Sequence, residues 1–227
     1  MSDARTRVRR LPERQVTDRA TLNDLLDATV YCHVGVALDD GVHVLPMAHA
    51  RDGDTLLVHG STGSRLMRAL AEGAGACVTV TEVTGIVVAR SAFDSSMHYR
   101  SAVIYGTFHP IVEQGSAELG QGSPGAVAAL DRLTETLIPG RSAEIRPPTA
   151  RELAATMILA MPLTEWALKV GAKHPDDPAE ERGQQVWAGW VPLTSRAGTP
   201  VPADEESAGL PVPASVQALV ERVNARP

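Results

Sequence analysis

The chain has 227 residues, of which 44% are hydrophobic and 21% are charged, and its formal net charge at pH 7 is -6. This composition is ordinary for a soluble globular protein with one well-packed domain, and the acidic balance gives no reason to expect nucleic acid or an anionic membrane as a partner. The sequence shows neither a signal peptide nor an apolar run of membrane-spanning length, so we expect a cytoplasmic protein.

The N-terminal segment "RTRVRRLPER" carries five arginines between Arg5 and Arg14, and we expect it to be a frayed, solvated arm. After it, "RATLNDLLDAT" over residues 19–29 spaces its leucines along one face of a short helix, with Asp18 in position to cap the first turn.

Short segments rich in valine, isoleucine and threonine follow, and turn signals separate them. The stretches "LDDGV" at 38–42 and "RDGD" at 51–54 are typical of β-hairpins. Closely spaced strands with such turns favour an antiparallel barrel or sandwich. The predicted strands cover residues 30–38, 43–50, 55–60, 77–83, 85–92 and 100–112.

The remaining sequence predicts more helices and two further strands. Thr149 and Glu152 have the spacing of a capping box, which marks the start of a helix. Helices are predicted over 64–73, 125–140, 149–156 and 214–223, strands over 157–170 and 186–194, and a polar loop over 171–185. We divide the chain into a β-rich domain with peripheral helices over 1–194 and a loosely packed, Pro-rich tail over 195–227.

Cys32 and Cys77 each lie inside a predicted apolar strand, so we expect buried free thiols in a reducing compartment. Two distant cysteines have no metal-ligand spacing, and we expect no metal site. The sequence also lacks the nucleophile-elbow motif of serine hydrolases.

The turn "HGSTGSR" at 59–65 joins a predicted strand to a predicted helix. Ser61, Thr62 and Ser64 would offer hydroxyl donors at the helix start, and Gly63 would let a ligand approach the backbone closely. Arg65 would add a fork of donors that matches phosphate oxygens. The turn therefore suggests a phosphate site, although serine also caps helices generally and Arg65 with Arg68 fits a solvated face.

A second group of candidate residues lies in "RSAVIYG" at 100–106. Both faces of this predicted strand carry apolar residues, as where a barrel meets a second subunit. Arg100 begins the strand and needs a counter-charge, which is either a carboxylate such as Glu82 or Asp94, or a ligand phosphate.

Near the end of the domain, Trp187 and Trp190 lie on opposite faces of a predicted strand. Core packing would explain both, and one of them is also suited to cover a flat ring system.

Taken together, these segments make the chain similar to the pyridoxamine 5′-phosphate oxidase-like superfamily, and to its actinobacterial flavin-nucleotide-binding branch, which is related to nitroimidazole-resistance proteins. The motifs that carry the resemblance include "CHVGVALDDGVHVLPM", "DGDTLLVHGSTGSRLMRAL" and "VTVTEVTGIVVARSAFDSSMHYRSAVIYG", and the similarity runs from about Arg9 to Leu193.

The resemblance implies an antiparallel split β-barrel of the FMN-binding type and a homodimer with flavin mononucleotide at its interface. It assigns the phosphate to Ser61, Ser64 and Arg65 with the pair Arg100 and Ser101, the isoalloxazine ring to the proline-bearing strand, and a flavin contact across the interface to Trp187. The full set expected to bind the cofactor is Leu45, Pro46, Met47, Ala48, His59, Ser61, Thr62, Gly63, Ser64, Arg65, Tyr99, Arg100, Ser101 and Trp187.

The chain also departs from its relatives near the expected ring. Ala48 and His49 stand where relatives often carry a bulky aromatic residue, His98 where asparagine is common, and Gly171 with Ala172 where an arginine is usual. We also do not find the substrate-phosphate residues of true pyridoxamine phosphate oxidases. The substrate is therefore expected to be a different, unidentified small molecule.

The resulting hypothesis is an FMN-dependent oxidoreductase that works by hydride or electron transfer. His49 is the candidate catalytic group, as proton donor or substrate orienter, and a space-filling histidine is the alternative. FAD or a deazaflavin are other possible cofactors. Two further hypotheses are a haem protein with an axial ligand among His33, His49, His59 and His98, and a non-catalytic flavin carrier or sensor.

Overall fold

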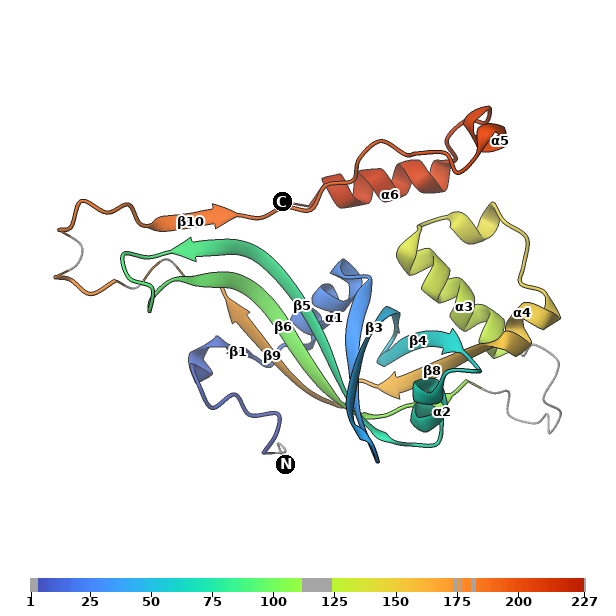
Figure 1. The fold of residues 1–227 in the computed structure, drawn as a ribbon, viewed down its shortest axis with the longest axis horizontal. Helices are drawn as coiled ribbons and strands as arrows, with labels where there is room; N and C mark the ends of the chain where they lie inside the picture. The colour runs from blue at the N-terminus through green and yellow to red at the C-terminus, as the bar shows by residue number, and fades with distance from the viewer. Residues whose placement is uncertain (1–3, 112–123, 174, 176, 181–182, 227) are drawn as a thin grey trace.

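The computed structural model describes the chain except residues 1–3, 112–123, 174, 176, 181–182 and 227. Antiparallel strands dominate, and helices lie around them (Figure 1), so the predicted mainly β fold is confirmed. The strands are β1 (Gln15–Val16), β2 (Tyr31–Leu38), β3 (Gly41–Asp52), β4 (Thr55–Ser61), β5 (Gly75–Val88), β6 (Ser96–Thr107), β7 (His109–Pro110), β8 (Thr156–Pro162), β9 (Glu165–Gly171) and β10 (Gly189–Pro192). The helices are α1 (Arg19–Ala28), α2 (Arg65–Ala71), α3 (Pro124–Leu137), α4 (Ala150–Ala155), α5 (Glu205–Ala208) and α6 (Ala214–Asn224), with 3-10 turns η1 (Pro12–Arg14) and η2 (Arg141–Ala143).

The sheet has the order β1-β9-β6-β5-β2-β3-β4-β8-β7 and closes on itself. Closure comes from the chain that runs through β6 into β7. β6 pairs with β5 and β9, whereas β7, which follows after Phe108, pairs with β8 at the other end of the sheet. β3 also has two partners, β2 along its first part and β4 from His49 onward. The result is the antiparallel split β-barrel that the sequence predicts.

The barrel interior is filled by alternate residues of the strands and by the apolar faces of α1 and α2. In β2, Cys32, Val34 and Val36 are buried, and the residues between them are exposed or half-buried. Each aliphatic side chain that is fully buried in this way stabilises the fold by about 1.5–3 kcal/mol. The helices contribute Leu22, Leu25, Leu26, Leu66, Met67 and Leu70 to the same core.

The predicted helix caps are confirmed. Asp18 accepts hydrogen bonds from the backbone N–H groups of Ala20 and Thr21 at the start of α1. Thr149 and Glu152 form both halves of a capping box at the start of α4. On the outside of the barrel, α3 packs over β3, β4 and β8 in a second, smaller core of Ala50, Leu57, Ala129, Leu133 and Ile158.

β5 and β6 are longer than the barrel needs, and together they form an arm that projects from it (Figure 1). The sequence predicts separate strands over 77–83 and 85–92, but β5 is one strand whose pairing register with β6 shifts between Val83 and Gly85. A bulge of this kind bends a strand without ending it. β10 adds to the edge of the arm, with Gly189 opposite Val88 and Pro192 opposite Gly85.

Two further sequence expectations are wrong in detail. The single strand predicted over 157–170 is two strands, β8 and β9, separated by Leu163 and Thr164. The N-terminal arm is docked on the sheet, where the guanidinium of Arg5 binds the carboxylate of Glu165 and Lys169 donates to the carbonyl of Arg10. Arginine-rich composition cannot reveal such partners, because they come from a distant strand.

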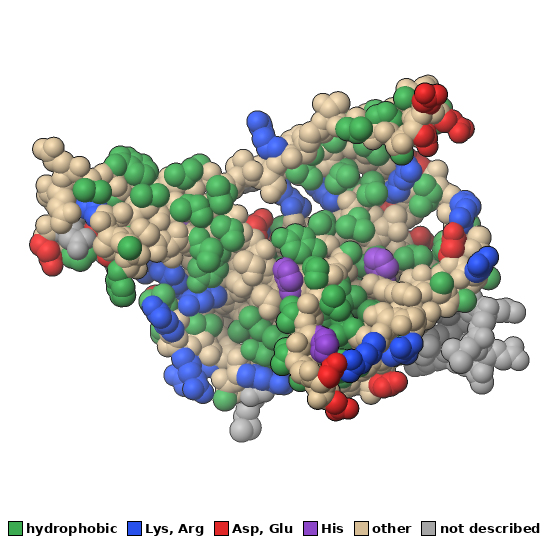
Figure 2. All heavy atoms as spheres, in the orientation of Figure 1, with side chains coloured by type: hydrophobic (Ala, Val, Ile, Leu, Met, Phe, Trp, Pro, Cys, Tyr) green, Lys and Arg blue, Asp and Glu red, His purple; other side chains and the backbone are tan. Residues whose placement is uncertain are grey.

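The C-terminal segment runs back from the arm to α3 (Figure 1), and gaps separate its middle from the barrel in the view of Figure 2. Its far end is attached by polar contacts. Arg222 of α6 donates to the carbonyls of Thr136 and Leu137 at the end of α3. Arg226 donates to the carbonyl of Ala28 at the end of α1. In the described residues, no helix is long and apolar enough to cross a membrane.

Candidate functional site

The predicted phosphate turn lies at the surface between β4 and α2. The side chains of Ser61 and Thr62 are exposed, and Ser64 caps α2 by accepting a hydrogen bond from Met67 N–H at 3.4 Å. Met67 of α2 packs directly against the backbone of β4 at Gly60. Only a glycine leaves room for this contact, because a Cβ atom there would lie 2.8 Å from Cγ of Met67. The close approach of β4 and α2 at Gly60 thus fixes where the turn sits.

Arg65 leaves the turn toward the loop between β2 and β3, where it forms a two-point ion pair with Asp40. Its two terminal nitrogens lie 2.6 and 2.9 Å from the carboxylate oxygens, and His43 Nε2 lies 2.9 Å from the same group. The hydrogen bonds from Arg65, and then that from His43, hold the pKa of the Asp40 carboxyl well below its usual range. Sequence reasoning missed Asp40, since "LDDGV" was fully explained as a hairpin turn.

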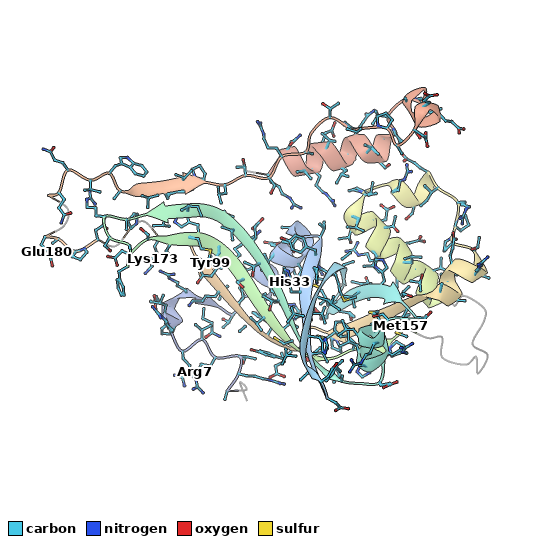
Figure 3. The ribbon with its side chains drawn as sticks, viewed as in Figure 1. Arg7, His33, Tyr99, Met157, Lys173 and Glu180 are labelled. Carbon is cyan, nitrogen blue, oxygen red and sulfur yellow. The ribbon has the colours of Figure 1, made fainter. Side chains whose placement is uncertain are left out.

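The second group of candidate residues lies on β6. Arg100 donates from Nε and a terminal nitrogen to the carboxylate of Glu82, its cross-strand neighbour, at 2.8 and 2.6 Å. Glu82, one of the two carboxylates considered from the sequence, is therefore a partner of Arg100. Ser101 shares a 2.8 Å hydrogen bond with the hydroxyl of Thr81. Tyr99 precedes them on the arm (Figure 3) and packs on Gly171, the glycine noted as a departure from relatives.

The predicted ring-binding strand is the middle of β3. Leu45 and Pro46 are exposed, whereas Met47 and Ala48 are half-buried. Beside them on β2, Pro46 faces His33 and Ala48 faces Tyr31. Tyr31 is 55% exposed, so this part of the sheet presents unusually large apolar side chains at the surface.

The candidate catalytic residue His49 points into the barrel. Its side chain is fully buried, and its Nε2 lies 3.1 Å from the carbonyl oxygen of Leu26 in α1. Burial lowers the pKa of His49 below its usual value, so the ring is neutral at pH 7. Within the described residues, its Nδ1 has no hydrogen-bond partner. The contact of His49 Nε2 with Leu26 joins β3 to α1.

The other histidines differ in how their rings are engaged. His98 is buried on β6, with Nε2 at 2.9 Å from the carbonyl of Lys173 and its ring 4.9 Å from that of Trp190. His59, at the end of β4, is half-buried, and its Nδ1 is buried without a hydrogen-bond partner in the part of the chain that the structure describes. Burial lowers the pKa of His59.

A cavity of about 720 Å³ lies over the outer face of β2, β5 and β6. The sequence did not predict this cavity. Small residues, Gly35, Ala37 and Gly75, form much of its floor. The Arg5 guanidinium lies 4.9 Å from the ring centroid of Tyr105 at one wall. The remaining lining residues include His33 of β2, Val42 and Val44 of β3, and Cys77 and Thr79 of β5.

The candidate residues do not converge on one point of a single chain. The turn before α2 and the strand β10 lie on opposite sides of the middle of the molecule along its long axis (Figure 1). Trp187, just before β10, is 66% exposed. In the described residues, no group of three or more His, Cys, Asp or Glu side chains has metal-binding geometry, and both cysteines are free.

The chain matches a known protein family and is similar to several solved structures. A family model described as pyridoxamine 5′-phosphate oxidase matches residues 18–170. The FAD and haem binding protein from Mycobacterium smegmatis is 44% identical, with a TM-score of 0.84 over 91% of this chain and 97% of that one. The flavocytochrome Anf3 from Azotobacter vinelandii is 30% identical, with the same TM-score over 95% and 96% of the two chains.

A more distant structure shows the same fold. The 5-nitroimidazole antibiotic resistance protein homologue from Bacteroides thetaiotaomicron is 18% identical, with a TM-score of 0.54 over 69% of this chain and 86% of that one. None of the curated proteins matches the chain.

Proposed function

The chain belongs to the pyridoxamine 5′-phosphate oxidase family, and from this premise we propose that it is a flavin-dependent oxidoreductase acting on a small molecule. The observation that carries the proposal is its 44% identity, over 91% of its length, to a protein that binds FAD and haem. The resemblance described for the sequence implies FMN. Because of this relative, we propose FAD ahead of FMN, with a deazaflavin as the remaining alternative.

The residues at the surface turn fit the phosphate end of a flavin nucleotide. The Arg65 side chain is 60% exposed, and Ser61 and Thr62 in the preceding turn are exposed as well. A phosphate presents two oxygens much as the Asp40 carboxylate does, so it can replace that carboxylate on the Arg65 fork. In this proposal Arg65 exchanges an internal partner for the ligand.

The outer sheet face fits a flat ring. The cavity there is lined mainly by apolar and small residues of β2, β3 and β5, and Pro46, which pairs with His33 on the same face, continues this surface. Such a surface shields one side of a planar cofactor from water. A bound flavin supplies the hydride or electron transfer itself.

The chain's own residues would bind and orient the cofactor. Arg65 and Arg100 would compensate the phosphate charge and take no part in the chemistry. His49 stays a prediction as the catalytic group. Its contact with Leu26 gives it a second role, because a neutral imidazole held there keeps β3 in place beneath the ring.

We further propose that the working form is a homodimer. The turn before α2 lies far from β10, which begins two residues after Trp187 (Figure 1). A flavin that contacts both the turn and Trp187 would therefore need the second copy to supply one of them. Val42 and Val44 on β3 are 77% and 60% exposed beside the cavity, an apolar surface suited to subunit contact.

The experiment that tests this function begins with the absorption spectrum of the purified protein and the mass of whatever small molecule heat releases. A two-band yellow spectrum with released FAD or FMN supports the flavin proposal. Turnover with a panel of reductants and nitro, quinone or enone acceptors then separates an oxidoreductase from a flavin carrier or sensor. A protein that takes up no flavin during reconstitution with excess FAD and FMN contradicts the proposal.

A second candidate function is haem binding. The surroundings of His59 in this chain favour it. An axial ligand needs a ring that the haem can reach, whereas the side chains of His49 and His98 are both buried in the fold. His59 is half-buried, and its Nδ1 has no hydrogen-bond partner among the described residues. We propose His59 as the haem ligand. The test titrates hemin into the His59→Ala variant and, for comparison, into the His33→Ala variant, and follows the Soret band. Loss of the Soret shift only in His33→Ala would assign the ligand to the cavity instead.

A further inference from the structure

Trp187 and Gly189 are in close contact where β10 begins. A Cβ atom at position 189 would lie 2.8 Å from Cζ2 of Trp187 and 2.9 Å from its Cη2, closer than Cβ atoms approach other atoms in proteins. The six-membered ring of the indole therefore rests against the backbone two residues further along. The side chain is still 66% exposed, so most of the ring surface remains open.

The backbone does not need a glycine at this position. Gly189 lies outside the set of described glycines with positive φ, and it pairs with Val88 in the regular ladder between β10 and β5. Alanine adopts such an extended conformation readily. The contact with Trp187 is thus the feature that a side chain at 189 would disturb.

We propose that Gly189 is a positioning residue that fixes the indole of Trp187 against the chain and leaves one face for a planar ring. This inference rests on the proposed function, in which Trp187 covers the flavin of the second copy. A mobile indole loses rotamer freedom when it stacks, and stacking requires an offset parallel geometry. Gly189 restricts the ring before the ligand arrives, so less freedom is lost on binding.

The test compares four full-length variants with the unaltered protein: Trp187→Ala, Gly189→Ala, the double variant and Gly198→Ala. Gly198 is the matched control, because it lies in the same C-terminal segment, has no positive φ, and a Cβ there would meet no atom within 4 Å. FAD is titrated into each protein, and both its dissociation constant and the quenching of its fluorescence are measured.

We expect Trp187→Ala and Gly189→Ala to weaken FAD binding by a similar factor, about threefold to tenfold, and to restore flavin fluorescence. The double variant should lose no more than either single one, because both changes remove the same contact. Gly198→Ala should behave as the unaltered protein does. Far-UV circular dichroism and the melting temperature should stay the same in all variants, which separates positioning from folding.

Three outcomes would overturn the inference, and they differ from one another. If Trp187→Ala weakens binding and Gly189→Ala does not, the tryptophan contact stands and the positioning role is wrong. If Trp187→Ala changes nothing, the proposed flavin contact of Trp187 is wrong. If the unaltered protein binds no FAD, the proposed function fails. Near-UV circular dichroism without FAD then still reports whether Gly189→Ala alters the Trp187 signal, and an unchanged spectrum contradicts the fixed indole.

Discussion

Arg65 and Asp40 form a two-point ion pair that joins the start of α2 to the turn between β2 and β3, with nitrogen–oxygen distances of 2.6 and 2.9 Å. Both side chains are largely exposed, at 60% and 51%. An exposed pair of this kind adds little to the stability of a fold. Its significance lies in where it directs the Arg65 guanidinium, from the start of α2 toward the turn between β2 and β3.

Replacing Arg65 with alanine should weaken FAD binding at least tenfold and leave the melting temperature within about 2 °C of the original, because a charge-assisted phosphate contact is lost and an exposed pair contributes little to folding. Isothermal titration and differential scanning calorimetry measure the two effects. Arg68→Ala, at an exposed position of the same helix, is the control. Equal FAD affinity in Arg65→Ala and Arg68→Ala would remove Arg65 from the site.

Replacing Gly60 with alanine should destabilise the protein by about 1–3 kcal/mol, because the new methyl group would overlap Met67 and push α2 away from β4. Urea unfolding measures the change. Gly198→Ala serves as the control, since a Cβ there meets nothing within 4 Å. FAD affinity should fall with Gly60→Ala as well, because α2 carries Arg65. A variant as stable as the original would show that Met67 repacks freely.

Stability should fall as the pH drops below about 6.5, because burial lowers the pKa of His49 in the folded state relative to its usual 6.5. Below that value the unfolded chain binds a proton that the folded chain does not, so unfolding is favoured, by at most about 1.4 kcal/mol per pH unit for this group. Above pH 6.5 the effect is absent. Melting temperatures from pH 5 to pH 8 should show a smaller slope for His49→Gln than for the unaltered protein, and parallel curves would contradict the assignment.

Replacing Arg222 with alanine should loosen the C-terminal segment, because its guanidinium donates to two carbonyls at the end of α3. Hydrogen bonds to a charged group contribute about 1.5–3 kcal/mol when partly buried. We expect faster amide exchange in α6 and in the last turn of α3, with the barrel strands unaffected. Arg151→Ala, on the exposed face of α4, should change neither. Unchanged exchange in α6 would mean that its apolar contacts alone hold it.

Much of the fold could be predicted because its signals are local. The cap at Asp18, the capping box at Thr149 and the alternation along β2 each depend on residues only a few positions apart. The bulge in β5 could not be predicted, since a glycine after a strand is also typical of a strand end, and only pairing with β6 decides between the two.

The candidate site was predictable in its parts and not in its arrangement. The motif at Ser61 to Arg65 identified a surface turn beside a helix start, and it lies where expected. The partner of Arg65 could not be found this way, because Asp40 is 25 positions away and already explained by its turn. The interior position of His49 depends on α1 covering β3, which no local pattern of β3 reveals.

The contact between Arg226 and the carbonyl of Ala28 joins positions that are 198 residues apart in the sequence. Contacts of such long sequence separation form slowly, because the chain between the two residues has to be ordered first. The last turn of α1 therefore gains this partner only once the barrel has closed and the C-terminal segment has docked on it. The two ends of the fold are completed together, late in folding.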